Sequence, residues 1–148
     1  MIPLLLFVAL TLTQKPPAPP SMTLPTGVVR VTFGGAQHYK DTLGKPTCAI
    51  VNALPAPVVF KGVREIAYAV ELKPKVVESA SARVIAPAGQ APLVAKSCNA
   101  FLPIPGGLSQ TQLGSAISRA DGQLLQPGAY ILRIVVDGET ADVPFTIK

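Results

Sequence analysis

The stretch AYILRIVVDGETADVPFTI, residues 129–147, decides the fold of this chain. Apolar residues recur at every second position on both sides of Asp137-Gly138, which is the pattern of strands with one buried face. Asp-Gly between two such runs indicates a tight hairpin, because both central residues of a type I′ turn need a positive φ. The inward-facing residues of this predicted hairpin are Tyr130, Leu132, Ile134, Val136, Val143, Phe145 and Ile147.

Pro144 falls on the side opposite these apolar residues and has no N–H to give to a neighbouring strand. We therefore expect the second strand of the hairpin to lie at an edge, to contain a bulge, or to turn the Pro144 position toward solvent. Tyr130 and Phe145 are the large inward-facing aromatic residues, and we expect both in the hydrophobic core.

Outside the hairpin, the clearest alternation spans residues 64–72. Its isoleucine, tyrosine, valine and leucine fall on one face and its glutamates and alanines on the other, which predicts a half-buried strand. Residues 106–119 fit one helical turn or an exposed loop, and their Gly, Ser, Thr and Gln content favours the loop. Weaker strands bounded by Gly, Pro or Asn are predicted at 28–33, 47–51, 58–60, 82–85 and 98–102.

The chain has 148 residues, of which 49% are hydrophobic and 14% are charged. This length suits one domain with its own core, and the apolar content argues against a wholly disordered chain. The 16 prolines and 12 glycines interrupt the sequence too often for long helices. We therefore expect an all-β fold, an antiparallel β-sandwich of about seven strands over residues 27–148.

The first residues differ from the rest of the chain. Residues 2–12 are apolar apart from one threonine, a length typical of a signal peptide and short of the roughly 18 residues that span a bilayer. We expect residues 1–14 to be a signal peptide, although a hydrophobic first strand fits the same run. Residues 15–26 are rich in proline and predict an extended spacer. The expected location is periplasmic or secreted, with no membrane span in the mature chain.

Cys48 and Cys98 are the only cysteines, and no Cys-x-x-Cys motif occurs. In an oxidising compartment two cysteines most simply form a disulfide bond, which we predict for this pair. Two reduced cysteines with an apolar role are the alternative if the chain is not exported. A metal site needs three or four ligands and the only other soft ligand is His38, so we expect no metal and no cofactor.

Residues 125–147, LQPGAYILRIVVDGETADVPFTI, resemble the closing hairpin of bacterial immunoglobulin-like domains. The shared features are a Pro-Gly-x-Tyr start, a long alternating strand and a last strand with a buried phenylalanine. The resemblance implies an immunoglobulin-like sandwich in which the Tyr130 hydroxyl bonds upstream backbone as a tyrosine corner. The chain has no tryptophan, and Leu132 stands where antibody-type domains place their second core cysteine, so a bridge between Cys48 and Cys98 would be a different one.

The sequence contains no recognisable catalytic motif. His38 is the only histidine, in a turn-like segment after a glycine pair, and no serine lies in a Gly-x-Ser-x-Gly elbow. The formal net charge is +5, but the basic residues form no continuous run and no aromatic series accompanies them, so we expect no nucleic-acid partner. Six basic residues belong either to an ordinary solvated surface or to a patch for anionic glycans, envelope lipids or an acidic partner: Lys40, Lys45, Lys61, Arg64, Lys73 and Lys75.

These features predict a non-catalytic, exported binding module that uses an edge strand, end loops or a basic face to contact a protein or an anionic envelope polymer. The alternative is a structural subunit of a larger envelope assembly, which exposed apolar residues would indicate. A small hydrolase with His38 and Asp41 in one pocket is a third hypothesis, and it requires a nucleophile or a metal beside them.

Overall fold

The described part of the computed structural model covers residues 23–73, 77–98 and 111–148, and it contains nine β-strands and no helix. The expected signal peptide, residues 1–14, and the spacer as far as residue 22 lie outside this part. The strands are β1 (Val28–Lys40), β2 (Pro46–Val51), β3 (Val59–Phe60), β4 (Glu65–Leu72), β5 (Ala80–Ile85), β6 (Leu93–Ser97), β7 (Thr111–Arg119), β8 (Gly128–Val136) and β9 (Glu139–Ile147).

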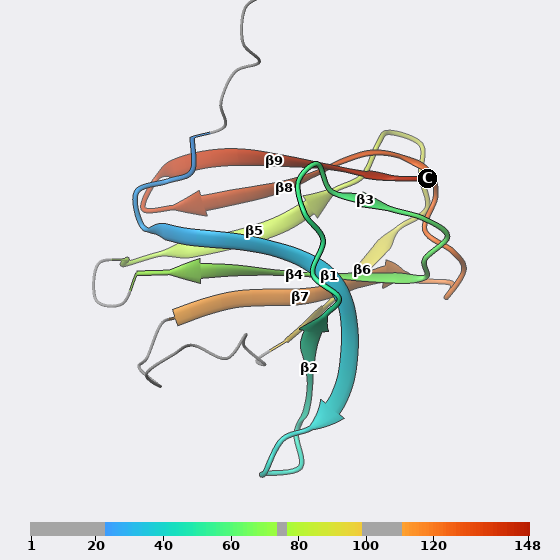
Figure 1. Cartoon of the computed structure of the whole chain (residues 1–148), viewed down its shortest axis with the longest axis horizontal. Helices are drawn as coiled ribbons and strands as arrows, with labels where there is room; N and C mark the ends of the chain where they lie inside the picture. The colour runs from blue at the N-terminus through green and yellow to red at the C-terminus, as the bar shows by residue number, and fades with distance from the viewer. Residues whose placement is uncertain (1–22, 74–76, 99–110) are drawn as a thin grey trace, which may run out of the picture.

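The strands form two facing sheets, as the sequence predicts (Figure 1). One sheet has five strands in the order β2-β1-β4-β7-β6, and the other has four in the order β3-β9-β8-β5. Neighbouring strands are antiparallel except β3 and β9, which run parallel. The fold is therefore an all-β sandwich, in which the apolar faces of the two sheets are buried against each other.

Phe145 on β9 lies in the centre of an aromatic cluster that joins the two sheets. Its ring centroid is 5.0 Å from that of Phe33, 5.4 Å from that of Tyr130 and 6.0 Å from that of Phe60. Phe33 comes from the five-stranded sheet and the other rings from the four-stranded one. Phe145 and Tyr130 are 2% and 1% exposed, so both belong to the core.

Phe145→Ala should lower the free energy of unfolding by roughly 3–5 kcal/mol, because it removes a large buried side chain and its ring contacts. Urea denaturation followed by circular dichroism measures the change. Tyr39→Ala is the matched control, since Tyr39 is 46% exposed, and its effect should stay near 0.5 kcal/mol or below, roughly that of a surface substitution. Equal midpoints for the wild type and Phe145→Ala would contradict the central position of this ring.

The β8–β9 hairpin has the predicted two-residue turn. Asp137 and Gly138 have φ values of 47° and 84°, the positive angles that a type I′ turn requires. The Asp137 side chain also fastens this end of the sandwich to the residues that precede β5, because its Oδ1 accepts hydrogen bonds from the backbone N–H groups of Glu78 and Ser79.

Pro144 stands where β9 needs no backbone donor. Val136 pairs with Glu139 across the turn, and hydrogen-bonded and non-hydrogen-bonded pairs alternate from there, which places Pro144 in a non-hydrogen-bonded pair. The N–H of Thr146, two residues later, accordingly points away from β8 and donates to the Val58 carbonyl. The proline therefore costs the hairpin no hydrogen bond, and it leaves the outer edge of β9 without a donor at this position.

The Tyr130 hydroxyl makes the corner contact that the family resemblance implies. It lies 2.7 Å from the Gln126 carbonyl oxygen and 2.6 Å from Gln90 Oε1. A hydroxyl has one proton, so it donates to one of these oxygens at a time. Burial raises the pKa of Tyr130, and the group therefore keeps its proton at neutral pH.

Tyr130→Phe should destabilise the fold by about 1–2 kcal/mol at neutral pH, because the Gln126 carbonyl loses this donor. The difference in stability between the wild type and this variant should become smaller at alkaline pH. Because the pKa of the folded tyrosine lies above its ordinary value of 10.0, the wild type loses stability as pH rises through this range, whereas the phenylalanine variant lacks the titration. Urea midpoints at about pH 7 and about pH 11 measure both effects, and a difference independent of pH would contradict the second.

Strand β4 is buried on both faces, whereas the sequence predicts a half-buried strand. It lies between β1 and β7, and Ala67, Ala69 and Glu71 on its second face are 0%, 3% and 1% exposed. The buried Glu71 carboxylate accepts hydrogen bonds from the guanidinium of Arg30 on β1, at 2.8 Å for the closest pair of atoms. The burial of this second face depends on residues distant in the sequence, such as Arg30, and cannot be read from the strand itself.

One prediction in the second half of the chain is wrong, and another falls mostly outside the described residues. The expected loop at 106–119 gives way to β7 from residue 111 onward, and residues 111–118 of β7 pair with β4. Ser115 separates the apolar Leu113 and Ile117 on its inner face, so the alternation is too weak to be recognised. The strand expected at 98–102 is preceded by β6, an exposed edge strand with no apolar pattern, and residues 99–102 lie outside the described part.

Part of the predicted spacer packs against the sandwich. Leu24 packs against the core, and Pro25 is buried. The Pro25 carbonyl accepts a hydrogen bond from the N–H of Val28 as the chain enters β1. The sandwich therefore includes residues upstream of the expected boundary at residue 27.

Candidate functional site

Strand β1 belongs to the body of the sandwich only through its first half. Residues 28–34 pair with β4, whereas residues 35–40 pair with β2. The β1–β2 hairpin therefore leaves the sandwich and projects below it in Figure 1. The sequence predicts a strand only at 28–33 and a turn around His38, because Gly34 and Gly35 interrupt the apolar pattern.

Gly34 lets the returning strand pass close to the bend. A Cβ atom at this position would lie 2.6 Å from the Val51 carbonyl oxygen and 2.7 Å from Ile50 Cγ2. Atoms do not approach so closely without displacement, so a larger residue would push β2 away from β1. The glycine therefore helps to fix the direction in which the hairpin leaves the sheet.

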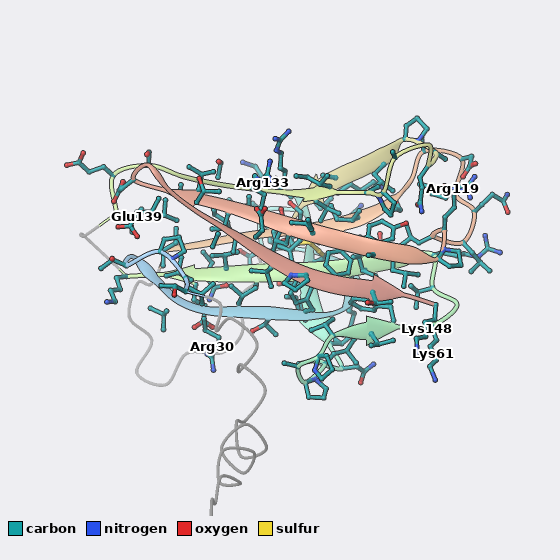
Figure 2. The ribbon with its side chains drawn as sticks, turned by 90° about the horizontal axis from the view of Figure 1, so that it is seen from above. Arg30, Lys61, Arg119, Arg133, Glu139 and Lys148 are labelled. Atoms are coloured by element: carbon teal, nitrogen blue, oxygen red, sulfur yellow. A yellow bond between two sulfur atoms is a disulfide. The ribbon has the colours of Figure 1, made fainter. Side chains whose placement is uncertain are left out.

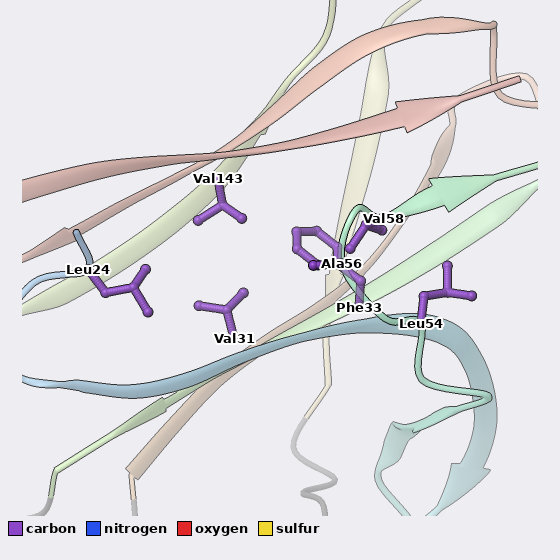
Figure 3. A pocket seen from close by; sticks show the side chains of 7 residues that line it. All are labelled: Leu24, Val31, Phe33, Leu54, Ala56, Val58 and Val143. Carbon is purple, nitrogen blue, oxygen red and sulfur yellow. The ribbon is translucent and has the colours of Figure 1, made fainter. Parts of the chain in front are cut away.

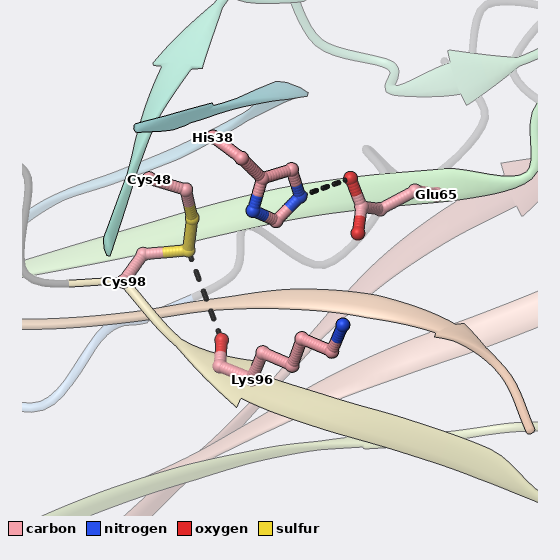
Figure 4. The surroundings of a disulfide bond; sticks show 5 residues. All are labelled: His38, Cys48, Glu65, Lys96 and Cys98. Carbon is pink, nitrogen blue, oxygen red and sulfur yellow. Dashed lines mark hydrogen bonds and ion pairs between the residues drawn. A yellow bond between two sulfur atoms is a disulfide. The ribbon is translucent and has the colours of Figure 1, made fainter. Parts of the chain in front are cut away.

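The predicted disulfide bond between Cys48 and Cys98 is present, and it fastens the hairpin to the sandwich (Figure 4). Cys48 lies on β2 and Cys98 directly follows β6, the strands at opposite edges of the five-stranded sheet. The N–H of Cys98 donates to the Gly114 carbonyl, and a Cβ on Gly114 would lie only 3.1 Å from the Cys98 oxygen. The two cysteines pack with Ala36 and Ala116 in a small second core on the outer face of this sheet.

Cys48→Ala/Cys98→Ala should lower the free energy of unfolding by roughly 4 kcal/mol, the amount that loop closure by such a bond contributes. Urea denaturation measures the loss, and the chemically reduced wild type should behave like the double variant. Amide hydrogen exchange should accelerate more in residues 35–40 than in β8, because the bond holds the hairpin in particular. Uniform acceleration would contradict a fastening role for the bond.

His38 pairs with Cys48 in the middle of the hairpin and lies beside the disulfide (Figure 4). Its Nε2 is 2.7 Å from Oε1 of Glu65 at the start of β4, and these side chains are 48% and 26% exposed. Within the described part of the chain, no hydrogen bond or ion pair joins His38 to Asp41, which binds its own turn instead. The described residues therefore do not bring together the pair on which the hydrolase hypothesis rests.

The hairpin tip, residues 39–45, is a turn stapled by one carboxylate. Asp41 Oδ1 accepts hydrogen bonds from the backbone N–H groups of Leu43 and Lys45, each at 2.9 Å. Backbone bonds from Asp41 N to the Lys45 oxygen and from Gly44 N to the Asp41 oxygen close the turn, and Gly44 has the positive φ of 79° that the turn requires. The backbone of the hairpin tip is therefore fixed without help from the rest of the fold.

The hairpin tip exposes two large apolar side chains. Leu43 is 79% exposed, the highest value among the large hydrophobic residues of the described part, and Tyr39 is 46% exposed. The other exposed members of this class are isolated on different elements: Val29 on β1, Val94 on β6 and Leu124 between β7 and β8. Among the described residues, only the hairpin tip brings two exposed large apolar side chains close together in the sequence.

The basic residues singled out in the sequence are distributed over separate regions. Lys40 and Lys45 flank the turn of the hairpin tip. Lys61 lies at the end of the sandwich that also carries Lys148, opposite Glu139 in Figure 2. Lys73 and Arg64 stand at opposite ends of β4, and Lys75 lies outside the described residues. One continuous basic face is therefore not formed, but two lysines share the hairpin tip with the exposed apolar residues.

The ion pair of Arg30 and Glu71 is a feature that sequence reasoning missed. Hydrogen bonding to Glu71 raises the pKa of Arg30, whose side chain is 58% exposed while that of Glu71 is 1% exposed. The two residues meet because a register shift in β1 places Arg30 opposite Glu71, and this register cannot be read from either strand alone. The buried carboxylate holds the arginine against the sheet.

A cavity of about 240 Å³ with apolar lining side chains lies between the two sheets where β1 and β9 face each other (Figure 3). The segment between β2 and β3 covers one side of it. Its lining carries no charged or polar side chain, so it offers shape and apolar surface but no catalytic group. The lining residues are Leu24, Val31, Phe33, Leu54, Ala56, Val58 and Val143.

Among the described residues, no group of three or more His, Cys, Asp or Glu side chains is placed to hold a metal ion. That part of the chain also contains no helix with the length and apolar character needed to cross a bilayer. No protein-family model, curated protein or solved structure matches the chain. The assignment of a function therefore rests on the geometry of the hairpin and its tip.

Proposed function

We propose that this chain is an exported, non-catalytic binding module whose projecting hairpin contacts a macromolecule of the cell envelope. The observation that carries the proposal is the hairpin tip, where Leu43 and Tyr39 are exposed beside two lysines on a stapled turn. Single exposed apolar residues are ordinary on protein surfaces, but two of them on one fixed, projecting element favour a contact with another molecule.

The sandwich is of the immunoglobulin-like type. The order β1-β4-β7-β6 in one sheet and β9-β8-β5 in the other corresponds to the A-B-E-D and G-F-C order of that fold, and the Tyr130 corner supports the same assignment. The β1–β2 hairpin is then an insertion after the first strand. Such insertions and loops vary freely on a rigid sandwich, which is why binding residues gather on them.

Export is supported by the disulfide bond and by the expected signal peptide. Disulfide bonds form and persist in oxidising compartments outside the cytosol, and the Cys48–Cys98 bond is buried in the fold. The apolar run at 2–12 has the length of a secretory leader. A periplasmic or secreted location places the hairpin tip among envelope polymers, lipids and proteins.

The experiment that tests the proposal is co-sedimentation of the purified protein with envelope fractions of its source cells. The wild type should be retained, and Leu43→Ser/Lys40→Ala/Lys45→Ala should bind at least roughly tenfold more weakly, because the contact loses its apolar anchor and two charges. The matched control is Leu124→Ser/Lys61→Ala/Lys73→Ala, which makes the same chemical changes at exposed positions away from the hairpin and should bind like the wild type. Equal retention of all three proteins, or retention of none, would refute the proposal.

A structural subunit of a larger envelope assembly is the second candidate function. The observation that favours it is the outer edge of β9, where the backbone groups of Thr140 and Asp142 have no strand partner in the described part of the chain. Strand addition at this edge would make the protein self-associate or join other subunits independently of the hairpin tip. Sedimentation velocity over a range of concentrations separates this function from the first.

A further inference from the structure

From its apex to its arms, the hairpin tip carries first an apolar, then two basic and then an aromatic side chain. Leu43 is in the turn at the apex, Lys40 and Lys45 stand one step back on the two arms, and Tyr39 follows on β1. The only acid in this segment is Asp41, and its carboxylate is engaged by backbone N–H groups inside the turn. The apex is therefore apolar and its surroundings are cationic, with two lysines against one inward-bonded aspartate.

This order matches the layers of a bilayer surface. An apolar apex suits the acyl boundary, lysine ammonium groups extend to phosphates, and tyrosine is favoured at the level of the headgroups. Anionic lipids attract basic residues near their surface, whereas neutral lipids do not. All three preferences are met by one short segment of this chain.

A protein pocket fits the hairpin tip less well. Stable protein interfaces bury about 800 Å² on each partner, which a turn of a few residues does not provide. A lipid surface has no such requirement, because it deforms around a projecting side chain and accepts several copies side by side. The fixed turn, and the disulfide on the β2 arm of the hairpin, also order the hairpin tip before contact, which reduces the ordering cost of binding.

We infer that the hairpin tip docks on an anionic lipid surface, with Leu43 at the acyl boundary and Lys40 and Lys45 at the phosphates. This inference rests on the proposed function and names lipid as the envelope component. The lipid is recognised by its negative headgroup and its apolar interior, and the sandwich itself stays in water.

The test uses purified protein and vesicles of phosphatidylcholine alone or mixed in equal amounts with phosphatidylglycerol. The wild type should sediment with the mixed vesicles, much less with the neutral ones, and progressively less as salt is added. Lys40→Ala/Lys45→Ala should bind roughly 25-fold more weakly, at about fivefold for each lysine. Leu43→Ser should bind roughly tenfold more weakly. Lys61→Ala/Lys73→Ala and Leu124→Ser have matched composition and should bind like the wild type.

The absence of tryptophan from the sequence allows a direct probe of insertion. Leu43→Trp places a single tryptophan at the apex, and its fluorescence should shift to the blue with mixed vesicles and be quenched by brominated acyl chains. Leu124→Trp is the control, since Leu124 is also exposed, and its emission should not change. Both positions are on the surface, so these variants should keep the urea midpoint of the wild type.

The outcomes separate this inference from the proposed function. No binding to mixed vesicles, equal loss in the hairpin and control variants, or an unshifted Leu43→Trp spectrum would overturn the lipid assignment. If envelope fractions still retain the protein through the hairpin tip in that case, the proposed function stands and the partner is a protein or another anionic polymer. Loss of both kinds of binding would overturn both.

Discussion

The covalent link between Cys48 and Cys98 is the constraint on which the unusual part of this molecule depends. The bond connects the two outer strands of one sheet, so it crosses the outer face of that sheet instead of the core between the sheets. It thereby holds a hairpin that shares only half of β1 with the sandwich. Without this bond the hairpin would have much more conformational freedom relative to the sandwich.

Small residues leave the space that the Cys48–Cys98 bond occupies. Gly34 admits the returning strand, Gly114 admits the backbone of Cys98, and Ala36 and Ala116 pack around the sulfur atoms. Each is too small to fill a core by itself. Together they let the two cysteines pack closely on the outer face of the sheet, the face on which Ala67, Ala69 and Glu71 of β4 are also buried.

Most of what could be predicted from the sequence is local. The β8–β9 hairpin is specified by alternation and by an Asp-Gly turn within 19 residues, so its strands, its turn and the burial of Phe145 follow from one segment. The two cysteines predict their own pairing because no other cysteine competes. These features require no knowledge of which strands become neighbours.

The remainder depends on contacts between distant parts of the chain. The burial of the second face of β4 depends on residues far from it in the sequence, such as Arg30. Similarly, β7 is recognised as a strand only from its pairing with β4 and β6. His38 and Glu65 form a contact although 27 positions separate them in the sequence. The exposure of Leu43 in a polar turn is not marked by any sequence pattern. From the sequence, the candidate site can be predicted only in part: its cysteines, Lys40 and Lys45 are singled out, and His38 and Asp41 are considered for a different role.

Pro144 limits how another strand can add to the outer edge of β9. The unpaired backbone groups at the edge of a sheet can pair with a strand of another molecule. β9 has such an edge beside the apolar cavity. Because Pro144 has no N–H, it interrupts any added ladder after Thr140 and Asp142. Any strand that adds to this edge is therefore limited to a short ladder beside Thr140 and Asp142.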